Sequence, residues 1–420
     1  MIQRGGGGRD FLLWFAGFAM LTPAAALELI LQNQTIFPAE DCALAQAHGR
    51  VLRADIRADR DLPPFDRVTM DGYALRSSAV AAGIRTFRIA AVQAAGMIPA
   101  ALGAEPNACV EIMTGAMLPE GADCVVPYEE VSKLNGTMTL NPDCQVAPGQ
   151  SVHAKGSDFK AGELIVAKGC RLTSREIAVA AGCGSATLHV SRLPKIAVVG
   201  TGDELVEVDA VVAPHQVRRS NDYALRAALI AAGYPMVERF HLHDMRHEIE
   251  HQVWHILAEF DAVLLTGGVS KGKFDYLPEV LETLGVKKVF HGVAQRPGKP
   301  FWFGLGPRLV SVFALPGNPV SAYTCLHRYV LPALAHASHQ TAKGPRPIRL
   351  AEAFAFKAPL ACLLPVKLVV DEQGNQTALP RPTNTSGDFA SLVGTDGFVE
   401  LPADQCSFPA GAIANFWSWA

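Results

Sequence analysis

The stretch from Leu264 to Tyr323 decides the fold, because it contains LLTGGVSKGKFDY (264–276), RPGKPFWFG (296–304) and ALPGNPVSAY (314–323). Three loops rich in glycine and proline each follow a short apolar run that is typical of a buried strand. An open α/β sheet binds ligands beyond the carboxyl ends of its strands, where such loops present their backbone. The stretch therefore predicts a ligand site at one edge of an α/β sheet.

These loops combine accessible backbone with charge. Glycines at positions 267, 268, 272, 298 and 317 let main-chain N–H groups approach an anion without an intervening Cβ. The same loops carry one carboxylate, Asp275, and four cations, Lys271, Lys273, Arg296 and Lys299. This combination indicates a phosphate-bearing ligand that is accompanied by a divalent metal.

Composition sets the class of protein. The chain has 420 residues, of which 49% are hydrophobic, so it has material for about two to four domains. Its formal net charge is −3, so no overall positive charge attracts nucleic acid or an anionic membrane. None of the nine cysteines is spaced as CxxC, which argues against a zinc site and a disulfide framework and favours the cytoplasm.

The first residues show a different pattern. Arg4 and Arg9 precede FLLWFAGFAML (11–21) and TPAAA (22–26), an arrangement similar to a secretory leader. The alternative is an apolar segment that packs on the first helix. Cleavage near Ala26 would remove Thr22 and Pro23, which we expect to cap and begin that helix, and the apolar run is too short to span a membrane.

Along the chain, the pattern predicts helical structure from Thr22 to about 58, with a second short helix that ends at Gly49. It then predicts a small β region of short strands over 84–152 and helical sequence again within 157–193. A discontinuous first domain with an inserted β domain is therefore expected. From Pro194 strands and helices alternate, which predicts a doubly wound α/β domain. KGPRP (343–347) is typical of a linker, and the remainder is β in character.

Four blocks in matching order resemble one family: DLPPFDRVTMDGYAL (61–75), EIMTGAMLPEGADCVV (111–126), VVGTGDEL (198–205) and the 264–323 stretch. They resemble the molybdopterin molybdotransferases, which include the E domain of gephyrin-like proteins. The resemblance implies a multidomain α/β plus β protein. Its expected domains are a discontinuous N-terminal linker domain (21–58 and 156–193), an inserted β domain (59–155), an α/β molybdopterin-binding domain (194–340) and a C-terminal β-barrel-like domain (346–420).

The resemblance also implies an activity. The family takes adenylylated molybdopterin and molybdate, hydrolyses the adenylate with a divalent metal, Mg²⁺, and delivers molybdenum cofactor and AMP. Its members are elongated homodimers, with the site between the α/β domain of one subunit and the β domain of the other. Contacts with molybdopterin adenylyltransferase and with apo-molybdoenzymes are expected.

Residue roles are implied by the positions that match the family. Catalytic positions are Asp71, Glu204, Asp244 and Asp275, of which Asp71, Glu204 and Asp275 would hold the metal. Substrate-binding positions are Thr114, Asp158, Gly267, Gly268, Ser270, Pro316, Gly317 and Pro319. Molybdate-binding positions are Arg296, Lys299, Ser386 and Arg381.

The chemistry of these residues agrees with the implied reaction. Release of AMP is a displacement at phosphorus, which a metal promotes by neutralising charge on the phosphate oxygens. Mg²⁺ prefers carboxylate oxygens and retains waters, so a few separate acids suit it. Molybdate is a tetrahedral dianion, for which arginine, lysine, hydroxyl and backbone N–H groups are natural partners. The chemistry of these residues does not distinguish molybdate from tungstate as the substrate.

The sequence departs from the family pattern at four places. Arg67-Val68-Thr69 stands where the family often has Asn-Ser-Ala, and His153-Ala154-Lys155 replaces a more arginine-rich run. Gly292 stands where the family often has lysine, and Arg296 replaces another lysine. Gly292 and the altered stretch at Arg67-Val68-Thr69 favour, as an alternative, a paralogous pterin-nucleotide hydrolase or transferase. A further alternative is a non-catalytic pterin-binding scaffold. The carboxylates argue against a pure scaffold, because an anion binder has no need of them.

Each candidate residue also has a purely structural interpretation. Asp71 precedes a glycine, as turn formers do, and Glu204 could be a first-turn acid. Asp244 and Asp275 could cap helices, and Lys271 and Lys273 could be solvated. Histidines at 243, 247, 251 and 255 are four residues apart, which would let neighbouring imidazoles chelate Zn²⁺ on one helix face or simply form a solvated face.

Overall fold

The computed structural model describes residues 20–267, 276–341 and 344–420. The chain divides into two compact units. The first comprises the described residues up to 40, residues 49–51 and the described residues from 191 to 420; the second comprises residues 41–48 and 52–190. No helix among the described residues is both long enough and apolar enough to cross a membrane.

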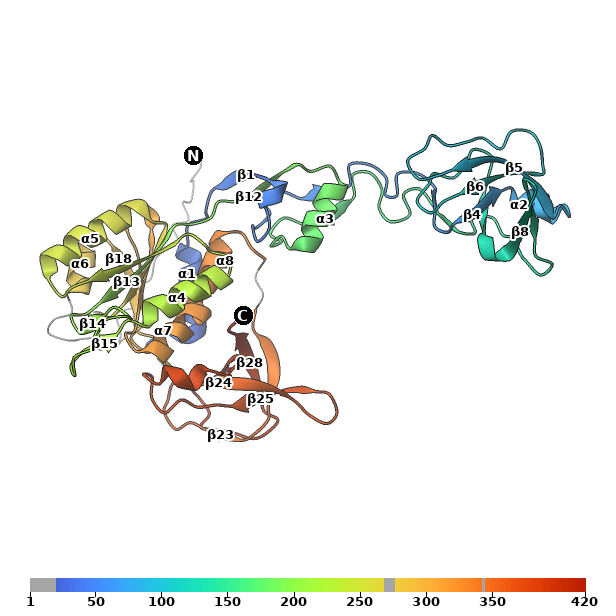
Figure 1. Cartoon of the computed structure of the whole chain (residues 1–420). Helices are drawn as coiled ribbons and strands as arrows, with labels where there is room; N and C mark the ends of the chain where they lie inside the picture. The colour runs from blue at the N-terminus through green and yellow to red at the C-terminus, as the bar shows by residue number, and fades with distance from the viewer. Residues whose placement is uncertain (1–19, 268–275, 342–343) are drawn as a thin grey trace, which may run out of the picture. The chain divides into compact units, whose positions relative to one another are not determined.

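The first unit is built on a six-stranded mixed sheet (Figure 1). Four strands are parallel neighbours and two more continue the sheet antiparallel. In spatial order they are β16 (Val237–Leu242), β13 (Ile196–Thr201), β17 (Ala262–Thr266), β21 (Ser311–Leu315), β20 (Trp302–Leu305) and β18 (Lys287–His291).

Helices cover both faces of this sheet, which explains why the central strands are buried throughout and mostly apolar. Alternate residues of β13 enter two different cores: Ile196 and Val198 pack with α4, whereas Ala197 and Val199 pack with α5. The first face carries α4 (Asn221–Ala231), α7 (Pro319–Cys325), a π-helical turn (Leu326–Val330), α8 (Leu331–Ala337) and α1 (Pro23–Asn33); the second carries α5 (Arg246–Glu259) and α6 (Leu277–Thr283).

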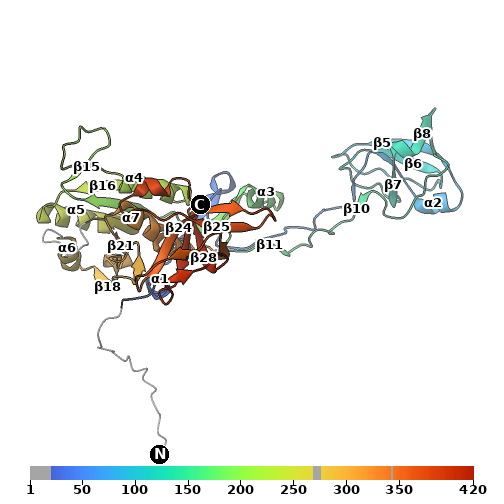
Figure 2. The ribbon, with the colours of Figure 1, turned by 90° about the horizontal axis from the view of Figure 1, so that it is seen from below.

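The C-terminal part of this unit is a closed barrel of five strands (Figure 2). The ring runs through β24 (Ala361–Val370), β25 (Gln376–Pro380), β22 (Arg346–Leu350), β28 (Ile413–Ser418) and β26 (Gly397–Leu401), and closes where β26 pairs with β24. The short strand β19 (Gln295–Arg296) also pairs with β24, so one loop of the α/β part lies along the barrel. A further pair is β23 (Phe354–Ala355) and β27 (Ser407–Phe408). The expected barrel-like C-terminal region is therefore present.

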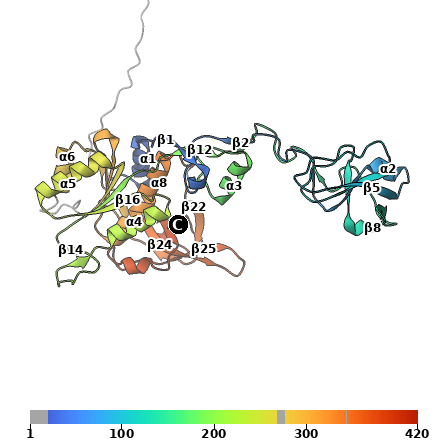
Figure 3. The same ribbon diagram turned by 45° about the horizontal axis from the view of Figure 1, so that its top comes forward.

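The second unit contains another six-stranded sheet (Figure 3). In spatial order its strands are β7 (Cys124–Pro127), β4 (Gly72–Leu75), β6 (Ala108–Ile112), β5 (Thr86–Gln93), β9 (Thr137–Leu140) and β8 (Val131–Leu134). Smaller elements are β2 (Ile56–Arg57), β3 (Arg67–Val68), α2 (Ser77–Ala81), β10 (Val152–His153), β11 (Leu164–Val166) and α3 (Ser174–Gly182). Thr173 and Glu176 form a capping box on α3.

The first helix begins as its sequence predicts, but the second predicted helix is wrong. Thr22 accepts a hydrogen bond from the Ala25 N–H at 3.2 Å, and Pro23 occupies the first turn. The helix ends at Asn33, where Gln34 already has extended backbone (φ −75°, ψ 126°), and Pro38 disfavours a return to helical backbone at the buried Phe37. The next elements along the chain are β1 (Ala39–Ala43), a single 3₁₀ turn (Leu44–Gln46) and β2.

Candidate functional site

A hollow of about 340 Å³ lies at the carboxyl ends of β13 and β17. We call it the α/β pocket. Its walls are the 200–205 loop, Thr266 and Gly267 after β17, the first turn of α4, the loop after β21, and Gly387 from the barrel part of the same unit. Four predicted site residues line it: Glu204, Gly267, Gly317 and Pro319. Two of the three loops for which the sequence predicts a ligand site, those after β17 and β21, contribute to this pocket.

Glycine at 267 is required by close contact of two strand ends. Its φ is +88°, and a Cβ there would lie 2.7 Å from the Thr201 carbonyl oxygen. A Cβ at Gly317 would lie 3.5 Å from the Gly267 Cα, so the loops after β17 and β21 touch. At positions 267 and 317 the pocket wall is therefore closely approaching main chain without side chains.

The loop after β21 is held by hydrogen bonds from two directions. Asn221, at the start of α4, donates from Nδ2 to the Gly317 carbonyl oxygen at 2.7 Å. Asn318 donates from Nδ2 to the Ser386 hydroxyl at 2.7 Å, and Val320 N–H donates to the Ser386 carbonyl oxygen at 3.0 Å. Ser386, predicted from the last part of the chain, is thus brought to the loop that contains Pro316 and Pro319.

Glu204 is an exposed carboxylate at the rim of the α/β pocket. It folds back over Gly202, where a Cβ would lie 2.4 Å from the Glu204 Oε2. The neighbouring Asp203 accepts hydrogen bonds from the Asp244 N–H and from His243 Nδ1, both at 3.1 Å. These bonds, the backbone one foremost, lower the pKa of Asp203. Asp244 therefore lies beside the 200–205 loop but is not among the described residues that line the pocket.

Buried residues support the loop that carries Arg296 and Lys299, the predicted molybdate-binding cations. Gln295 is fully buried, donates from Nε2 to the Pro297 carbonyl oxygen at 3.1 Å, and accepts from the Tyr329 hydroxyl. Gly298 has a φ of +92°, and a Cβ there would lie 2.6 Å from Cys325 Sγ. Arg296 and Lys299 are exposed on this loop. Neither they nor Arg381 are among the described residues that line the α/β pocket.

In the second unit, residues 66–71 include the predicted site residue Asp71. This segment pairs on one side with the chain near Thr114 and on the other with the chain that leads to Asp158. Asp71 accepts hydrogen bonds from the Thr114 N–H at 2.6 Å and from its hydroxyl at 2.7 Å, and these bonds, the backbone one first, lower the pKa of Asp71. On the other side of the segment, Thr69 N–H donates to the Ser151 carbonyl oxygen at 3.0 Å. Asp158 lies further along the same part of the chain, and its Oδ1 is 2.8 Å from His153 Nε2.

Three predicted residues, Gly268, Ser270 and Asp275, lie outside the described residues, as do Lys271 and Lys273. The histidine series does not form a metal site in the part of the chain that the structure describes, since no group of three or more His, Cys, Asp or Glu there could hold an ion. The rings of His251 and His255 pack 4.7 Å apart on α5, and both residues are exposed, as expected for a solvated helix face.

Sequence reasoning missed the charged residues that line the α/β pocket from the end of β15 (Val217–Arg218) to the first turn of α4. Arg219 and Asp222 form an ion pair in which both side chains are buried, and Arg239 reaches the same Asp222 carboxylate at 3.1 Å. Arg218 lies on the exposed side. The run RRSND (218–222) before a helix was the available signal, but it does not reveal which cation is buried.

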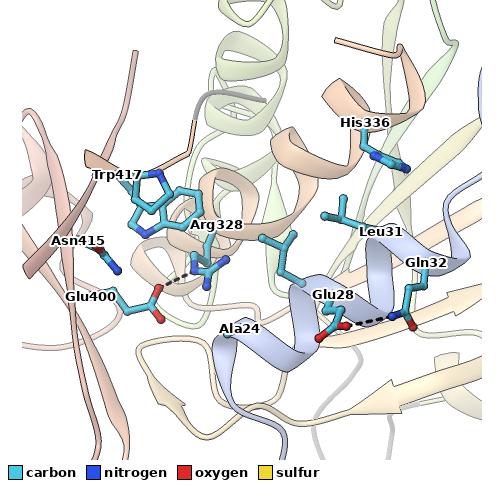
Figure 4. Close-up of a pocket in the computed structure, with 11 residues that line it drawn as sticks. Ala24, Glu28, Leu31, Gln32, Arg328, His336, Glu400, Asn415 and Trp417 are labelled. Atoms are coloured by element: carbon cyan, nitrogen blue, oxygen red, sulfur yellow. Dashed lines mark hydrogen bonds and ion pairs between the residues drawn. The ribbon is translucent and has the colours of Figure 1, made fainter. Parts of the chain in front are cut away.

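A second hollow of about 590 Å³ lies where α1 and α8 meet the barrel (Figure 4). Leu27 and Leu31 of α1 form part of its wall. On the barrel side, Arg328 donates from Nε to Glu400 at 2.7 Å, and its guanidinium lies 4.3 Å from the centre of the Trp417 ring. No predicted site residue lines this hollow. Its buried ion pair therefore connects the barrel to the helices.

Comparison with known proteins assigns the class of the α/β part first. Residues 197–336 match the model of a probable molybdopterin binding domain. Residues 21–184 match the MoeA N-terminal region (domain I and II), and residues 347–419 match the MoeA C-terminal region (domain IV).

Whole-chain relatives extend this match. A curated molybdopterin molybdenumtransferase of Synechocystis sp. is 41% identical over 401 residues, which are 95% of this chain and 100% of the relative. One from Staphylococcus aureus (strain Mu50) is 32% identical over 92% of both chains. A crystal structure of a molybdopterin biosynthesis MoeA protein from Pyrococcus horikosii has a TM-score of 0.79 at 31% identity and covers 96% of this chain and 100% of its own. The chain belongs to the MoeA family of molybdopterin molybdenumtransferases.

Proposed function

We propose that the chain inserts molybdate into adenylylated molybdopterin with release of AMP, yielding molybdenum cofactor. The observation that carries the proposal is the α/β pocket, which combines glycine main chain at Gly267 and Gly317 with the carboxylate of Glu204. Main chain without a Cβ lets N–H groups approach phosphate oxygens. The exposed carboxylate beside these glycines suits a divalent cation. Without a cation, the carboxylate and the phosphate of the ligand would repel each other.

The described residues have separate tasks in this reaction. The loop after β21, held by Asn221 and Ser386, orients the pterin nucleotide. The 296–300 loop presents Arg296 and Lys299, whose positive charges hold molybdate, with Ser386 and Arg381 as further contacts. Only Arg296 can offer a bidentate guanidinium; Lys299 acts as a point charge. Gln295 donates to the Pro297 carbonyl oxygen and accepts from the Tyr329 hydroxyl, and these bonds keep the loop and its two cations oriented.

Mg²⁺ is the cation that this donor set suits. Glu204 would hold it together with Asp275 and Asp71, which are oxygen ligands of the kind that Mg²⁺ takes while retaining waters. When bound, the cation neutralises charge on the phosphate oxygens during the displacement at phosphorus. Asp244 helps to position the 200–205 loop, because its backbone N–H donates to Asp203, as does the ring of His243.

The remaining expectations complete the proposal. The protein acts as a homodimer in the cytoplasm, and Asp71, Thr114 and Asp158 of one subunit complete the pocket of the other. The four-domain division (21–58 with 156–193, 59–155, 194–340 and 346–420) describes each subunit. Molybdopterin adenylyltransferase would supply the substrate, and apo-molybdoenzymes would receive the product.

The direct test incubates the purified full-length chain with adenylylated molybdopterin, Mg²⁺ and molybdate. AMP release and a product that activates an apo-molybdoenzyme are expected, and loss of both is expected for Glu204→Gln. Glu238→Gln, on an exposed position of β16, is the matched control and should retain activity. A wild-type chain that binds the pterin nucleotide but releases no AMP would reject the proposal.

Gly292 favours a second candidate, a paralogous hydrolase or transferase acting on a related pterin nucleotide. Its φ is +92°, a backbone conformation that lysine rarely adopts. The backbone at position 292 therefore favours glycine over the lysine of the family pattern. This candidate predicts AMP release at an equal rate with and without molybdate. Strict dependence on molybdate would exclude it.

A further inference from the structure

Two of the places where the sequence departs from the family pattern lie opposite each other. Arg67 on β3 and His153 on β10 are register partners in an antiparallel pair. The Arg67 guanidinium donates from Nη2 to His153 Nδ1 at 3.1 Å. The same imidazole contacts Asp158 Oδ1 through Nε2 at 2.8 Å. Arg67, His153 and Asp158 therefore form a continuous chain of side-chain hydrogen bonds.

The chemistry of arginine determines where the protons lie in this chain. A guanidinium has only donors, so Nδ1 of His153 must be the acceptor in its contact with Arg67. The imidazole is then neutral and carries its proton on Nε2, from which it donates to the Asp158 carboxylate. Arg67 and Asp158 thus require the same tautomer: Arg67 needs an acceptor at Nδ1, and the Asp158 carboxylate needs a donor at Nε2.

The backbone around Asp158 is held as well. Asp158 N–H donates to the Leu62 carbonyl oxygen at 3.0 Å, and Gly156 N–H donates to that of Pro63 at 2.9 Å. Lys155 N–H donates to Asp66 Oδ1 at 2.8 Å. Asp158 keeps half of its side chain exposed. Its Oδ2 accepts no hydrogen bond from the described residues, so a firmly placed acceptor faces solvent.

We propose that Arg67 and His153 are positioning residues, which hold the Asp158 carboxylate so that its second oxygen accepts a hydrogen bond from an N–H or O–H group of the substrate. This inference rests on the proposed function, because it places Asp158 in the pterin-nucleotide site. A carboxylate acceptor suits the amino and amide groups of a pterin or the hydroxyls of a ribose, and it disfavours the phosphates. The pair therefore contributes to recognition of the neutral part of the ligand.

The first measurement is the tautomer of His153 in the full chain labelled with ¹⁵N-histidine, with the signal identified by its absence in His153→Gln. The wild type should show the proton on Nε2 and none on Nδ1, and Arg67→Met, in which no donor faces Nδ1, should show a larger share of molecules with a proton on Nδ1. Arg67→Lys should restore the wild-type tautomer in part, since an ammonium can also donate to Nδ1. An unchanged tautomer in Arg67→Met would overturn the proposal.

The second measurement is the kinetics of AMP release. Arg67→Met should raise the KM for adenylylated molybdopterin about threefold to tenfold with a smaller change in kcat, and Arg67→Lys should recover part of the loss. Combining Arg67→Met with Asp158→Asn should add little to the effect of Asp158→Asn alone. Arg88→Met is the matched control, because Arg88 is an exposed arginine in the same unit that pairs with Glu105.

The two measurements separate the possible failures. A wild-type chain without AMP release rejects the proposed function, while the tautomer measurement still tests the Arg67–His153 contact. An active wild type whose KM is unaffected by Arg67→Met, or additive effects of the Arg67 and Asp158 changes, overturns the positioning role.

Discussion

The Asp71 carboxylate accepts two hydrogen bonds from one residue, Thr114: the backbone N–H at 2.6 Å and the hydroxyl at 2.7 Å reach the same Oδ1. Both bonds favour the ionised form, which lowers the pKa of Asp71. Its other oxygen is left to contact a ligand. Asp71 is thus held as an oriented, charged acid, whichever ligand it meets.

We expect Thr114→Val to weaken this arrangement without abolishing it, because the backbone bond remains. Loss of the hydroxyl bond moves the pKa of Asp71 back toward 3.8. The acid limb of the pH–rate profile for AMP release should therefore shift to higher pH, with a rate loss of about fivefold. Thr114→Ser, which keeps a hydroxyl, should behave as wild type. An acid limb that stays in place would show that Asp71 ionisation does not control the rate.

Gly267→Ala should destabilise the fold by about 2 kcal/mol or more, since strain at positive φ adds to a collision with the Thr201 carbonyl oxygen. Gly285→Ala is the control: its φ is +79°, yet a Cβ there meets nothing within 4 Å. Its cost should be only about 1 kcal/mol. Urea unfolding of both variants measures the difference. Equal costs would mean that the contact between the strand ends relaxes freely.

Removal of one partner from the buried Arg328–Glu400 pair should be costly. The Arg328 side chain is 4% exposed and that of Glu400 is 18% exposed, so Arg328→Met leaves a carboxylate in poorly solvated surroundings. The expected loss in the free energy of unfolding is about 3 kcal/mol. The exposed pair of Arg88 and Glu105 provides the comparison, and Arg88→Met should cost about 1 kcal/mol or less. Adding Glu400→Leu to Arg328→Met should recover part of the loss.

His327 should make stability depend on pH. Burial among Tyr323 and Trp419 lowers the pKa of His327 from 6.5 to about 4. The unfolded chain binds the proton more readily, so the contribution of His327 is fully present above pH 6.5 and is lost as the pH falls toward about 4. The change amounts to about 3 kcal/mol at most.

The check is the free energy of unfolding measured from pH 7 to pH 4. His327→Phe should remove most of the dependence in this window, since a neutral ring suits the aromatic surroundings. His255→Gln, at an exposed position of α5, should leave it intact. A His327→Phe protein with the same pH dependence as wild type would assign the effect to other groups.

Much of the α/β part could be predicted from local pattern. The strand Ala262–Thr266 follows the alternation of strands and helices predicted from Pro194 onward, because a mostly apolar run between a helix and a glycine has no competing structure. The glycines at 267 and 317 were predicted to leave the backbone accessible, and both line the α/β pocket where the loops after β17 and β21 touch. The error between residues 34 and 58 arose where apolar residues are spaced as in a helix, while Pro38 and the burial of Phe37 favour extended backbone.

The sequence by itself determined the alternation of strands and helices, the glycine loops at the strand ends and the identity of the acids and cations near them, since these depend on neighbours in the chain. The tertiary structure alone decided which charges pair: Arg219 with Asp222, Arg328 with Glu400, and Arg67 with His153. Two of these pairings join residues 72 and 86 positions apart. Burial and strand register select such partners, and both properties exist only once the chain has folded.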